Sequence, residues 1–285
     1  MRLMRFKVGD RRSWGIAGNN GVIDAGARLG TQYPDVVDVL EAGALKELES
    51  LAGHRSDHPF DQIEFLPPVR SRNAVLAVGR NYGSAYEDMG TKFPGHPSIF
   101  QRRYEAQVGH KQPLVRPKAS HLFDGEAELA LVIGRRGRHI AEKDAFSHII
   151  GYSIFNDGSV VDWGDHTARN VTPGKNFKAS GAFGPWMVTA DELPDAGKGL
   201  KIQSRLNGQV MQSDNTDNMM FPVAEMLVYV TQGMTLEPGD IIFTGTPSGV
   251  GHARKPNPIW MKQGDVCEVE IEGIGVLRNP IQDEK

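Results

Sequence analysis

Two glutamates, Glu126 and Glu128, interrupt an otherwise largely apolar segment that runs from Phe123 to Gly134. Alternate residues of a β-strand point to the same face, so a strand here predicts that Glu126 and Glu128 lie side by side. The rest of both faces is apolar, which indicates a buried strand. Two like charges in such a place need a cation or a bound proton, because burying unpaired charge is costly. This strand therefore favours a hard divalent metal ion with oxygen ligands.

Asp157 is the expected third ligand, because it ends the next apolar segment, 151–156. One short helix, expected over 141–148, separates the two strands, and strands joined this way are often neighbours in a sheet. Three carboxylates suit Mg²⁺ or Mn²⁺, whereas structural zinc favours cysteine and histidine clusters that this sequence lacks. Two alternatives stay open: Asp157 caps a turn before Gly158, or the ligands come from the following loop, as Asp162, Asp165 and His166.

The composition is that of an ordinary globular protein, with 285 residues, 39% hydrophobic residues and a formal net charge of -3. Charges of both signs are interspersed and no basic stripe occurs, which argues against nucleic acid or an anionic membrane as the main partner. No apolar run is long enough to span a membrane, and the first residues lack a signal-peptide core, so we expect a cytoplasmic protein. The single cysteine, Cys267, is expected to fill the core.

Residues 1–68 predict a small N-terminal α/β domain, with strands over 3–8, 13–17 and 22–24 and amphipathic helices over 33–42 and 44–51. Pro67 and Pro68 mark its boundary with a strand-dense catalytic domain, 69–285. The 33 glycines and 17 prolines punctuate many short strands. The expected fold class is therefore α+β and rich in β-strands.

Two further segments carry candidate functional groups. Lys175 follows a Pro-Gly turn in the long polar connection 158–177; it either points into a pocket, where an ammonium would stabilise a developing oxyanion, or lies on the surface. The loop 245–249, Gly-Thr-Pro-Ser-Gly, lacks the lysine of a phosphate-binding loop. Its amides, that of Gly245 among them, and the Thr246 hydroxyl are instead expected to receive a carboxylate or ketone oxygen.

Five motifs, in order along residues 70–280, resemble the fumarylacetoacetate hydrolase family: Gly79-Arg-Asn-Tyr82, Asp124-Gly-Glu-Ala-Glu-Leu-Ala130, Gly151-Tyr-Ser-Ile-Phe-Asn-Asp157, Pro173-Gly-Lys-Asn-Phe177 and Leu236-Glu-Pro-Gly-Asp-Ile-Ile-Phe-Thr-Gly-Thr-Pro-Ser-Gly-Val-Gly251. The resemblance implies a mixed β-roll catalytic domain that is usually a homodimer. It also implies Mg²⁺ or Mn²⁺ held by Glu126, Glu128 and Asp157, with Lys175 in the active site and the Thr246 loop against a small 2-oxo acid substrate. A role in the degradation of aromatic compounds is a further expectation from this resemblance.

The chain departs from the family pattern at four positions. The family's lid motif, Asn-Tyr-x-x-His-x-x-Glu, has Ala85 in place of histidine and Asp88 in place of glutamate. The usual arginine and glutamine after the ligand aspartate fall on Val161 and Gly164. The metal ligands are intact but the water-activating residues are not, and loss of a general base typically lowers rates by about two to four orders of magnitude.

The segment 81–95 is expected to form a mobile lid over the metal site, because it contains three glycines and few apolar residues that could anchor it. Closure would bring Tyr82, Tyr86, Glu87 or Asp88 toward the substrate, and Asp88 is the preferred acid–base group. In the alternative interpretation this segment is a solvated helix, and metal-bound water does the proton work unaided. Arg102 is a candidate clamp for a substrate carboxylate, with surface exposure as its alternative.

The first functional interpretation is a metal-dependent hydrolase that cleaves C–C bonds of acylpyruvate-type 2,4-dioxo acids through an enolate. The second keeps the enolate without water attack, giving a decarboxylase, hydratase, isomerase or tautomerase, and the missing lid histidine favours it. The third is a catalytically silent metal-binding homologue. The sequence leaves open the substrate's R group, the preferred metal and the pathway.

Overall fold

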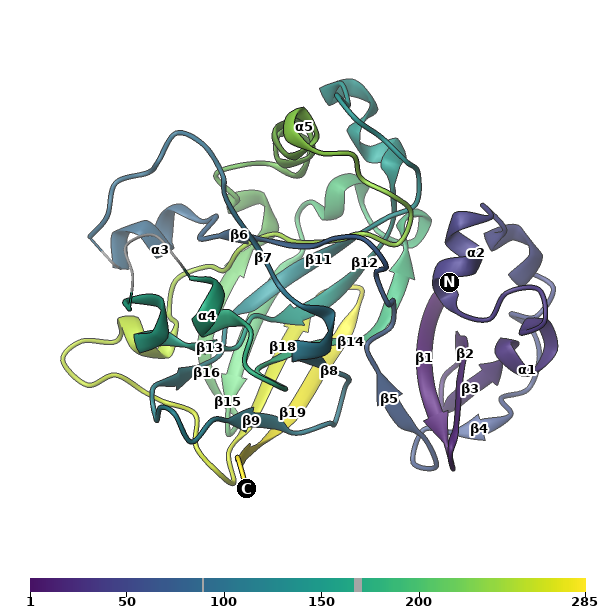
Figure 1. Ribbon diagram of the computed structural model, residues 1–285, viewed down its shortest axis with the longest axis horizontal. Coiled ribbons are helices and arrows are strands. Elements are labelled where there is room, and N and C mark those ends of the chain that lie inside the picture. The colour runs from purple at the N-terminus through teal and green to yellow at the C-terminus, as the bar shows by residue number, and fades with distance from the viewer. Residues whose placement is uncertain (89, 167–170) are drawn as a thin grey trace.

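The computed structural model describes residues 1–88, 90–166 and 171–285, so the predicted lid 81–95 and the predicted loop 158–177 fall partly outside the described residues. Most strands join one large sheet (Figure 1), ordered β4 (His58–Pro59), β3 (Gly21–Asp24), β2 (Arg11–Ala17), β1 (Arg2–Val8), β14 (Gly181–Thr189), β12 (Ile149–Asn156), β11 (Ala127–Ile133), β17 (Ile241–Phe243), β6 (Val75–Gly79) and β7 (Ser98–Gln101). β5 (Glu64–Leu66) adds to β1, and β8 (Gln107–Val108) adds to β14.

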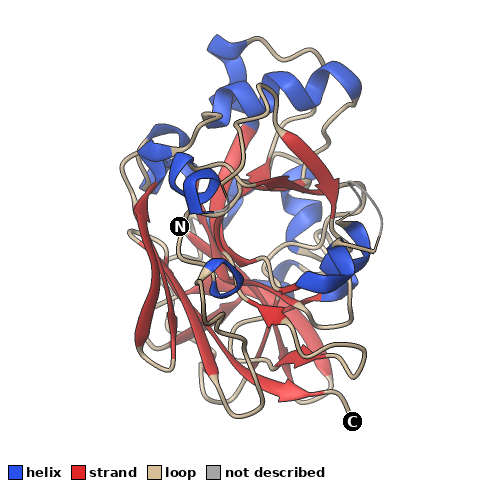
Figure 2. Cartoon of the chain, turned by 90° about the vertical axis from the view of Figure 1, so that its left-hand side faces the viewer, coloured by secondary structure: helices blue, strands red, loops and turns tan. Residues whose placement is uncertain are grey.

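A second sheet packs against the large one, and its order is β16 (Gln209–Asn215), β15 (Lys201–Leu206), β18 (Val266–Ile271), β19 (Gly275–Asp283) and β9 (Leu114–Arg116). β10 (Phe123–Asp124) and β13 (Ser159–Val160) form a separate two-stranded ladder. Figure 2 shows strands through most of the molecule, with the helices lying around them. The expected α+β, strand-rich fold class is confirmed.

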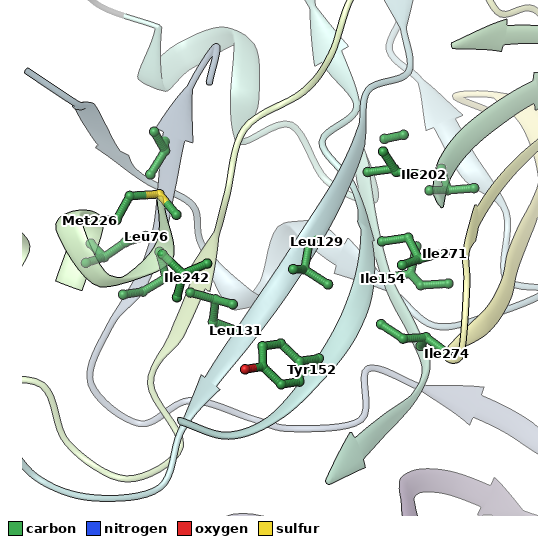
Figure 3. Packing of buried hydrophobic residues seen from close by; sticks show 14 of the residues in the cluster. Leu76, Leu129, Leu131, Tyr152, Ile154, Ile202, Met226, Ile242, Ile271 and Ile274 are labelled. Atoms are coloured by element: carbon green, nitrogen blue, oxygen red, sulfur yellow. The ribbon is translucent and has the colours of Figure 1, made fainter. Parts of the chain in front are cut away.

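The β11 strand lies between two hydrophobic clusters, as its two apolar faces predict. Leu129 and Leu131 belong to a cluster shared with the second sheet, whereas Ala130 and Val132 belong to the cluster on the other face. Figure 3 shows Leu129 near Ile154. Both side chains belong to the cluster that includes side chains of the second sheet. All seven residues of β11 are buried, so the charge of a glutamate on this strand has no water around it.

The helices are short and surround the sheets: α1 (Ala25–Leu29), α2 (Val36–Glu41), α3 (Gly83–Asp88), α4 (Thr172–Lys175) and α5 (Val223–Gly233). The segments 44–51 and 141–148, expected as α-helices, form 3₁₀ turns over Leu45–Leu48 and Glu142–His148 instead. Cys267 is buried within the core, as expected. None of the helices in the described part of the chain is both long and apolar enough to cross a membrane.

The N-terminal segment is not a self-contained unit. β1 pairs antiparallel with β14, so the large sheet runs without interruption from the first residues into the strands around β11. Leu3 and Trp14 share one hydrophobic cluster with Phe155 and Phe243. The alternation of residues along the sequence predicts strands and the pairing of segments that follow one another. It does not predict the pairing of β1 with β14, which are far apart in the sequence. A domain boundary at 68/69 stays a prediction.

Candidate metal centre and active-site cavity

The pairing of β11 with β12 brings the three predicted ligands together. The two strands are antiparallel neighbours, as expected, with Ala127 opposite Asn156. The Asp157 amide donates to the Glu126 carbonyl oxygen at 2.8 Å, which holds the two chain segments in register just beyond this pair. Carboxylate oxygens of Glu126, Glu128 and Asp157 all lie within 4.8 Å of one another. Glu126 itself precedes β11 and does not lie in the strand.

Two cations face this acidic group: Arg102, which is fully buried, and Lys175, which keeps 12% of its side-chain surface exposed. Lys175 Nζ lies 2.6 Å from Asp157 Oδ2 and 2.9 Å from Glu126 Oε1, and Arg102 Nη1 lies 3.2 Å from Asp157 Oδ1. Burial lowers the pKa of Lys175, but the charges of Asp157 and Glu126 outweigh it and the pKa rises. Three carboxylates against two cations leave one negative charge uncompensated in a region nearly free of water.

Glu128 carries the electrostatic cost of this arrangement. Burial, followed by the charges of Asp157 and Glu126, raises the pKa of Glu128 well above its ordinary value. Its Oε2 accepts a hydrogen bond from the Gly245 amide at 2.9 Å. The carboxyl group is therefore held in place by the backbone while its charge is disfavoured.

The residues present fit a hard divalent cation. Asp157 Oδ1 is buried and accepts no hydrogen bond in the described structure, and the Ser159 hydroxyl orients Glu126 by donating to its Oε1 at 2.8 Å. Carboxylate oxygens at this spacing are the ligands that Mg²⁺ and Mn²⁺ prefer. Within the described residues, this is the group of three acidic, histidine or cysteine side chains close enough to share one ion. Metal binding by these three residues stays a prediction.

The rival ligand set in the following loop is not assembled. Asp162 accepts a hydrogen bond from the Ser120 hydroxyl at 2.7 Å, and His166 lies against the Trp163 ring. Asp165 is exposed. A loop without strand geometry leaves these side chains with separate partners.

A cavity of about 560 Å³ opens in front of the acidic group, and Glu126, Asp157 and Lys175 line it. Its wall includes residues from α3, from α4 and from the loop after β17, segments far apart in sequence. The positions where the family pattern has histidine, arginine and glutamine also line it, as Ala85, Val161 and Gly164. Side chains at these positions would therefore face a bound substrate, and here they offer no acid or base.

Three of the predicted substrate-binding residues do not line this cavity. Arg102 has no exposed side-chain surface and contacts Asp157, so it pairs with a candidate ligand instead of clamping a substrate carboxylate. Tyr82 is fully buried, and its hydroxyl has no partner in the described structure. Gly245 uses its amide to hold Glu128, and its φ of +91° suits glycine. A sequence motif indicates that such a residue lies near the site. It does not indicate whether the side chain lines the cavity or is buried behind it.

The predicted lid is anchored at its start, contrary to the expectation that it lacks anchors. The Asn81 side-chain amide donates to the carbonyl oxygens of Phe221 at 3.0 Å and Thr244 at 2.9 Å. Tyr82, Ala85 and Tyr86 are buried, because α3 turns its apolar side toward the core. Lid motion of the remainder stays a prediction.

Asp88, the predicted acid–base group, is exposed at the end of α3 and lines the cavity. Its Oδ2 accepts a hydrogen bond from the Gly249 amide at 2.9 Å. This contact ties the helix to the loop after β17, which gives the carboxylate a structural partner. A catalytic role for Asp88 stays a prediction.

Thr246 lines the cavity as expected, and a residue outside the sequence motifs orients it. Gln212 Nε2 donates to Thr246 Oγ1 at 2.7 Å and to the Pro247 carbonyl oxygen at 2.9 Å. Gln212 is buried in β16, so the loop is fixed from behind. No local pattern in the sequence singles out this glutamine.

The sequence interpretation also missed a histidine. His252 lines the cavity, and its Nδ1 lies 2.8 Å from Asp124 Oδ2. The available signal was its place in the chain, since it follows the Gly-Thr-Pro-Ser-Gly-Val-Gly loop directly. Asp124 stands two residues before Glu126 in the acidic motif.

Comparisons with known proteins show the family and the fold of this chain. The family model described as "Fumarylacetoacetate (FAA) hydrolase C-terminal" matches residues 74–282. Oxaloacetate tautomerase FAHD2A, mitochondrial, of Bos taurus is 37% identical over 289 residues, covering 99% of this chain and 91% of the relative. The solved fumarylacetoacetate hydrolase of Exiguobacterium antarcticum is 33% identical, with a TM-score of 0.86 over 100% of both chains.

A further solved structure is maleylpyruvate hydrolase of Sphingobium sp. SYK-6 in complex with manganese(II) ion and pyruvate. It is 26% identical to this chain, with a TM-score of 0.82 over 100% of both chains. The resemblance that the five motifs indicated is confirmed. A family model that matches most of the chain, and a relative aligned along nearly all of it, show that this chain belongs to the fumarylacetoacetate hydrolase family.

Proposed function

We propose that this chain is a divalent-metal-dependent tautomerase that interconverts the keto and enol forms of a 2-oxo dicarboxylic acid, with oxaloacetate as the first substrate to test. The observation that carries the proposal is a cavity beside three carboxylates, with Lys175 on its wall and Ala85 where a water-activating histidine is usual. Enolisation needs no attacking water, so this reaction does not require the histidine that Ala85 replaces. The relative from Bos taurus, named an oxaloacetate tautomerase, supports the same reaction class.

Several charged groups at the cavity have a role in this reaction. Glu126, Glu128 and Asp157 would hold a divalent ion, which when bound acts as a Lewis acid toward the 2-oxo acid. The Lys175 ammonium, which contacts Glu126 and Asp157, stabilises negative charge as it develops on the enolate oxygen. Lys92 also lines the cavity and supplies a positive charge that suits a second substrate carboxylate.

A hydrolase of acylpyruvates is the second candidate. The Sphingobium protein, which is named a maleylpyruvate hydrolase, supports this candidate, because its structure aligns with the whole of this chain. Its chemistry would need a water-activating group at a place other than Ala85. We also propose that the protein is a homodimer, that it is cytoplasmic and that it acts in the degradation of aromatic compounds. The relative from Bos taurus, by contrast, is named mitochondrial.

One experiment separates the two reactions. Enolic oxaloacetate is mixed with the protein in Mg²⁺ or Mn²⁺, and its conversion to the keto form is followed by ultraviolet absorbance. Acetylpyruvate and fumarylpyruvate are incubated in parallel and analysed for cleaved acid by mass spectrometry. Metal without protein and protein with a chelator are the controls, because divalent ions alone catalyse enolisation.

We expect metal-dependent ketonisation well above the metal-only rate and no cleaved acid. Cleavage of acylpyruvates without accelerated ketonisation would favour the hydrolase. No reaction with any of the three compounds would contradict both and leave the silent homologue.

A further inference from the structure

His252 and Asp124 form a polar pair on the wall of the same cavity, outside the group of carboxylates. His252 lies in a short 3₁₀ turn, Gly251–Ala253, after the loop that carries Thr246. The His252 side chain keeps 18% of its surface exposed, whereas that of Asp124 keeps 5%. The ring therefore reaches the cavity, and the carboxylate that holds it is shielded from water.

The Asp124 carboxylate is fixed by the backbone. Its Oδ1 accepts hydrogen bonds from the amides of Gly125 at 2.8 Å and Gly251 at 3.1 Å, and its Oδ2 accepts one from the His252 amide at 2.7 Å. A Cβ on Gly251 would lie 2.7 Å from Asp124 Oδ1 and 2.0 Å from the Ile259 carbonyl oxygen, so glycine permits this close approach. The imidazole thus meets an acceptor of fixed position.

The contact with Asp124 selects one tautomer of the ring. A carboxylate accepts the proton of Nδ1, which leaves Nε2 as the nitrogen with a free lone pair in the neutral imidazole. Within the described part of the chain, Nε2 makes no hydrogen bond to a side chain or carbonyl group. An aspartate that orients a histidine in this way is a recurrent arrangement for proton transfer.

We propose that His252 is the catalytic acid–base residue of this chain and that Asp124 is its positioning residue, so that this pair takes the role of the lid histidine replaced by Ala85. The proposal rests on the proposed enolisation of a 2-oxo acid. It assigns a proton acceptor to a cavity in which the positions of the family's histidine, arginine and glutamine, Ala85, Val161 and Gly164, supply none.

The other ionisable groups of the cavity are less suited to this role. Lys175 is paired with two carboxylates and carries a raised pKa, so it holds its proton. Asp88 already accepts the Gly249 amide. Burial lowers the pKa of His252, but the hydrogen bond with Asp124 and the charge of Glu126 outweigh it and the pKa rises above its ordinary value. Histidine is the side chain that most often both accepts and returns a proton in catalysis.

The proposed step is balanced within the substrate and the ring. His252 Nε2 takes a proton from C3 of the keto acid; the electron pair of that C–H bond becomes the C2–C3 double bond, and the π pair of the carbonyl moves to its oxygen. The imidazolium then returns the proton to this enolate oxygen, which gives the enol and the neutral ring. The reverse sequence converts enol to keto, and no other reactant is consumed.

The central test compares His252→Asn with the parent. The asparagine amide occupies the place of Nδ1 and still donates to Asp124, whereas the position of Nε2 is lost. Proton exchange is measured as deuterium uptake at C3 of oxaloacetate and pyruvate, together with kcat and KM for ketonisation, the melting temperature and the Mn²⁺ affinity. His110→Asn is the matched control, since His110 does not line the cavity.

We expect His252→Asn to lower kcat and exchange by about 10²- to 10⁴-fold, with KM, melting temperature and Mn²⁺ affinity unchanged. Free imidazole should partly restore exchange to His252→Ala, which a merely structural role would not allow. At a pH high enough to leave the ring neutral, nitrogen-15 spectra of the metal-free protein should show His252 protonated at Nδ1 and unprotonated at Nε2, and Asp124→Asn should remove that preference.

The outcomes separate this inference from the proposed function. If the parent exchanges C3 protons and His252→Asn does so equally fast, the inference is overturned and the proposed function stands. If the parent exchanges no protons in any 2-oxo acid, the proposed function fails, whatever tautomer His252 adopts. A neutral ring protonated at Nε2 and not at Nδ1 in the parent would overturn the positioning role of Asp124.

Discussion

Glu128→Gln is expected to have opposite effects on stability with and without metal. The glutamine side chain is nearly isosteric with that of Glu128, and its oxygen can still accept the Gly245 amide. The substitution removes one of three negative charges within 4.8 Å of one another. Without metal this relieves repulsion, and with metal it removes a ligand.

The magnitude without metal follows from the raised pKa of Glu128, whose causes are burial and then the charges of Asp157 and Glu126. Between the unfolded and the folded pKa the folded state binds more protons, so its stability falls as pH rises through that window. Each pH unit of that window is worth about 1.4 kcal/mol. The glutamine variant should escape this loss and be the more stable of the two.

The magnitude with metal follows from linkage. Metal at 100 times its dissociation constant stabilises a single-site protein by about 2.7 kcal/mol. For a chain of this size each kcal/mol raises the melting temperature by roughly 2–4 °C, so the parent should gain roughly 5–10 °C. Glu128→Gln should gain little or nothing at the same metal concentration.

Thermal unfolding of both proteins at pH 7, in chelator and in Mn²⁺, measures both effects. Asp217→Asn, a substitution outside the cavity, is the control for a lost surface carboxylate. Parent and variant stabilised equally by Mn²⁺ would refute the assignment of Glu128 as a ligand. A metal-free variant less stable than the parent would refute the argument from charge repulsion.

Three further predictions concern single side chains. Gly245→Ala should lower the free energy of unfolding in urea by about 1–3 kcal/mol, because its Cβ would lie 2.6 Å from Asn81 Cβ at a φ of +91°. Tyr82→Phe should unfold at the same or a higher urea concentration than the parent, because the lost hydroxyl is buried without a partner, and an unchanged KM would exclude a substrate contact. Hydrogen bonds from Arg28 hold the pKa of Asp57 at about 2, so Asp57→Asn should cost stability above pH 4, and urea unfolding should show that difference narrowing as pH falls toward 2.

The metal half of the site could be predicted from sequence because it depends on local alternation. Glu128 lies on a strand whose two apolar faces are readable in order, and Asp157 follows the neighbouring strand directly. The strand register that aligns these two carboxylates follows from the single short connection between β11 and β12. Here the sequence pattern and the packing carry the same information.

The remainder depends on contacts between distant segments. β1 pairs with a strand more than 170 residues away, and Gln212 reaches Thr246 from a different sheet. Arg102 was expected to contact substrate, but it is fully buried and contacts Asp157. The charges in the sequence suggested a site, but they do not indicate how deeply a side chain is buried. Such contacts follow from sheet order, which no local periodicity encodes.

The β10–β13 ladder joins the two halves of the proposed chemistry. Asp124 pairs with Ser159 across this ladder, and the Ser159 hydroxyl orients Glu126 while the Asp124 carboxylate orients His252. A metal ligand and the proposed proton acceptor are thus positioned by opposite residues of a single strand pair, which leaves little freedom for one to move relative to the other. The proton acceptor of the usual family pattern lies on the α3 segment, so its position depends on how that segment closes. Moving this role to His252 would uncouple proton transfer from closure, and α3 would then serve to shape the cavity and exclude water.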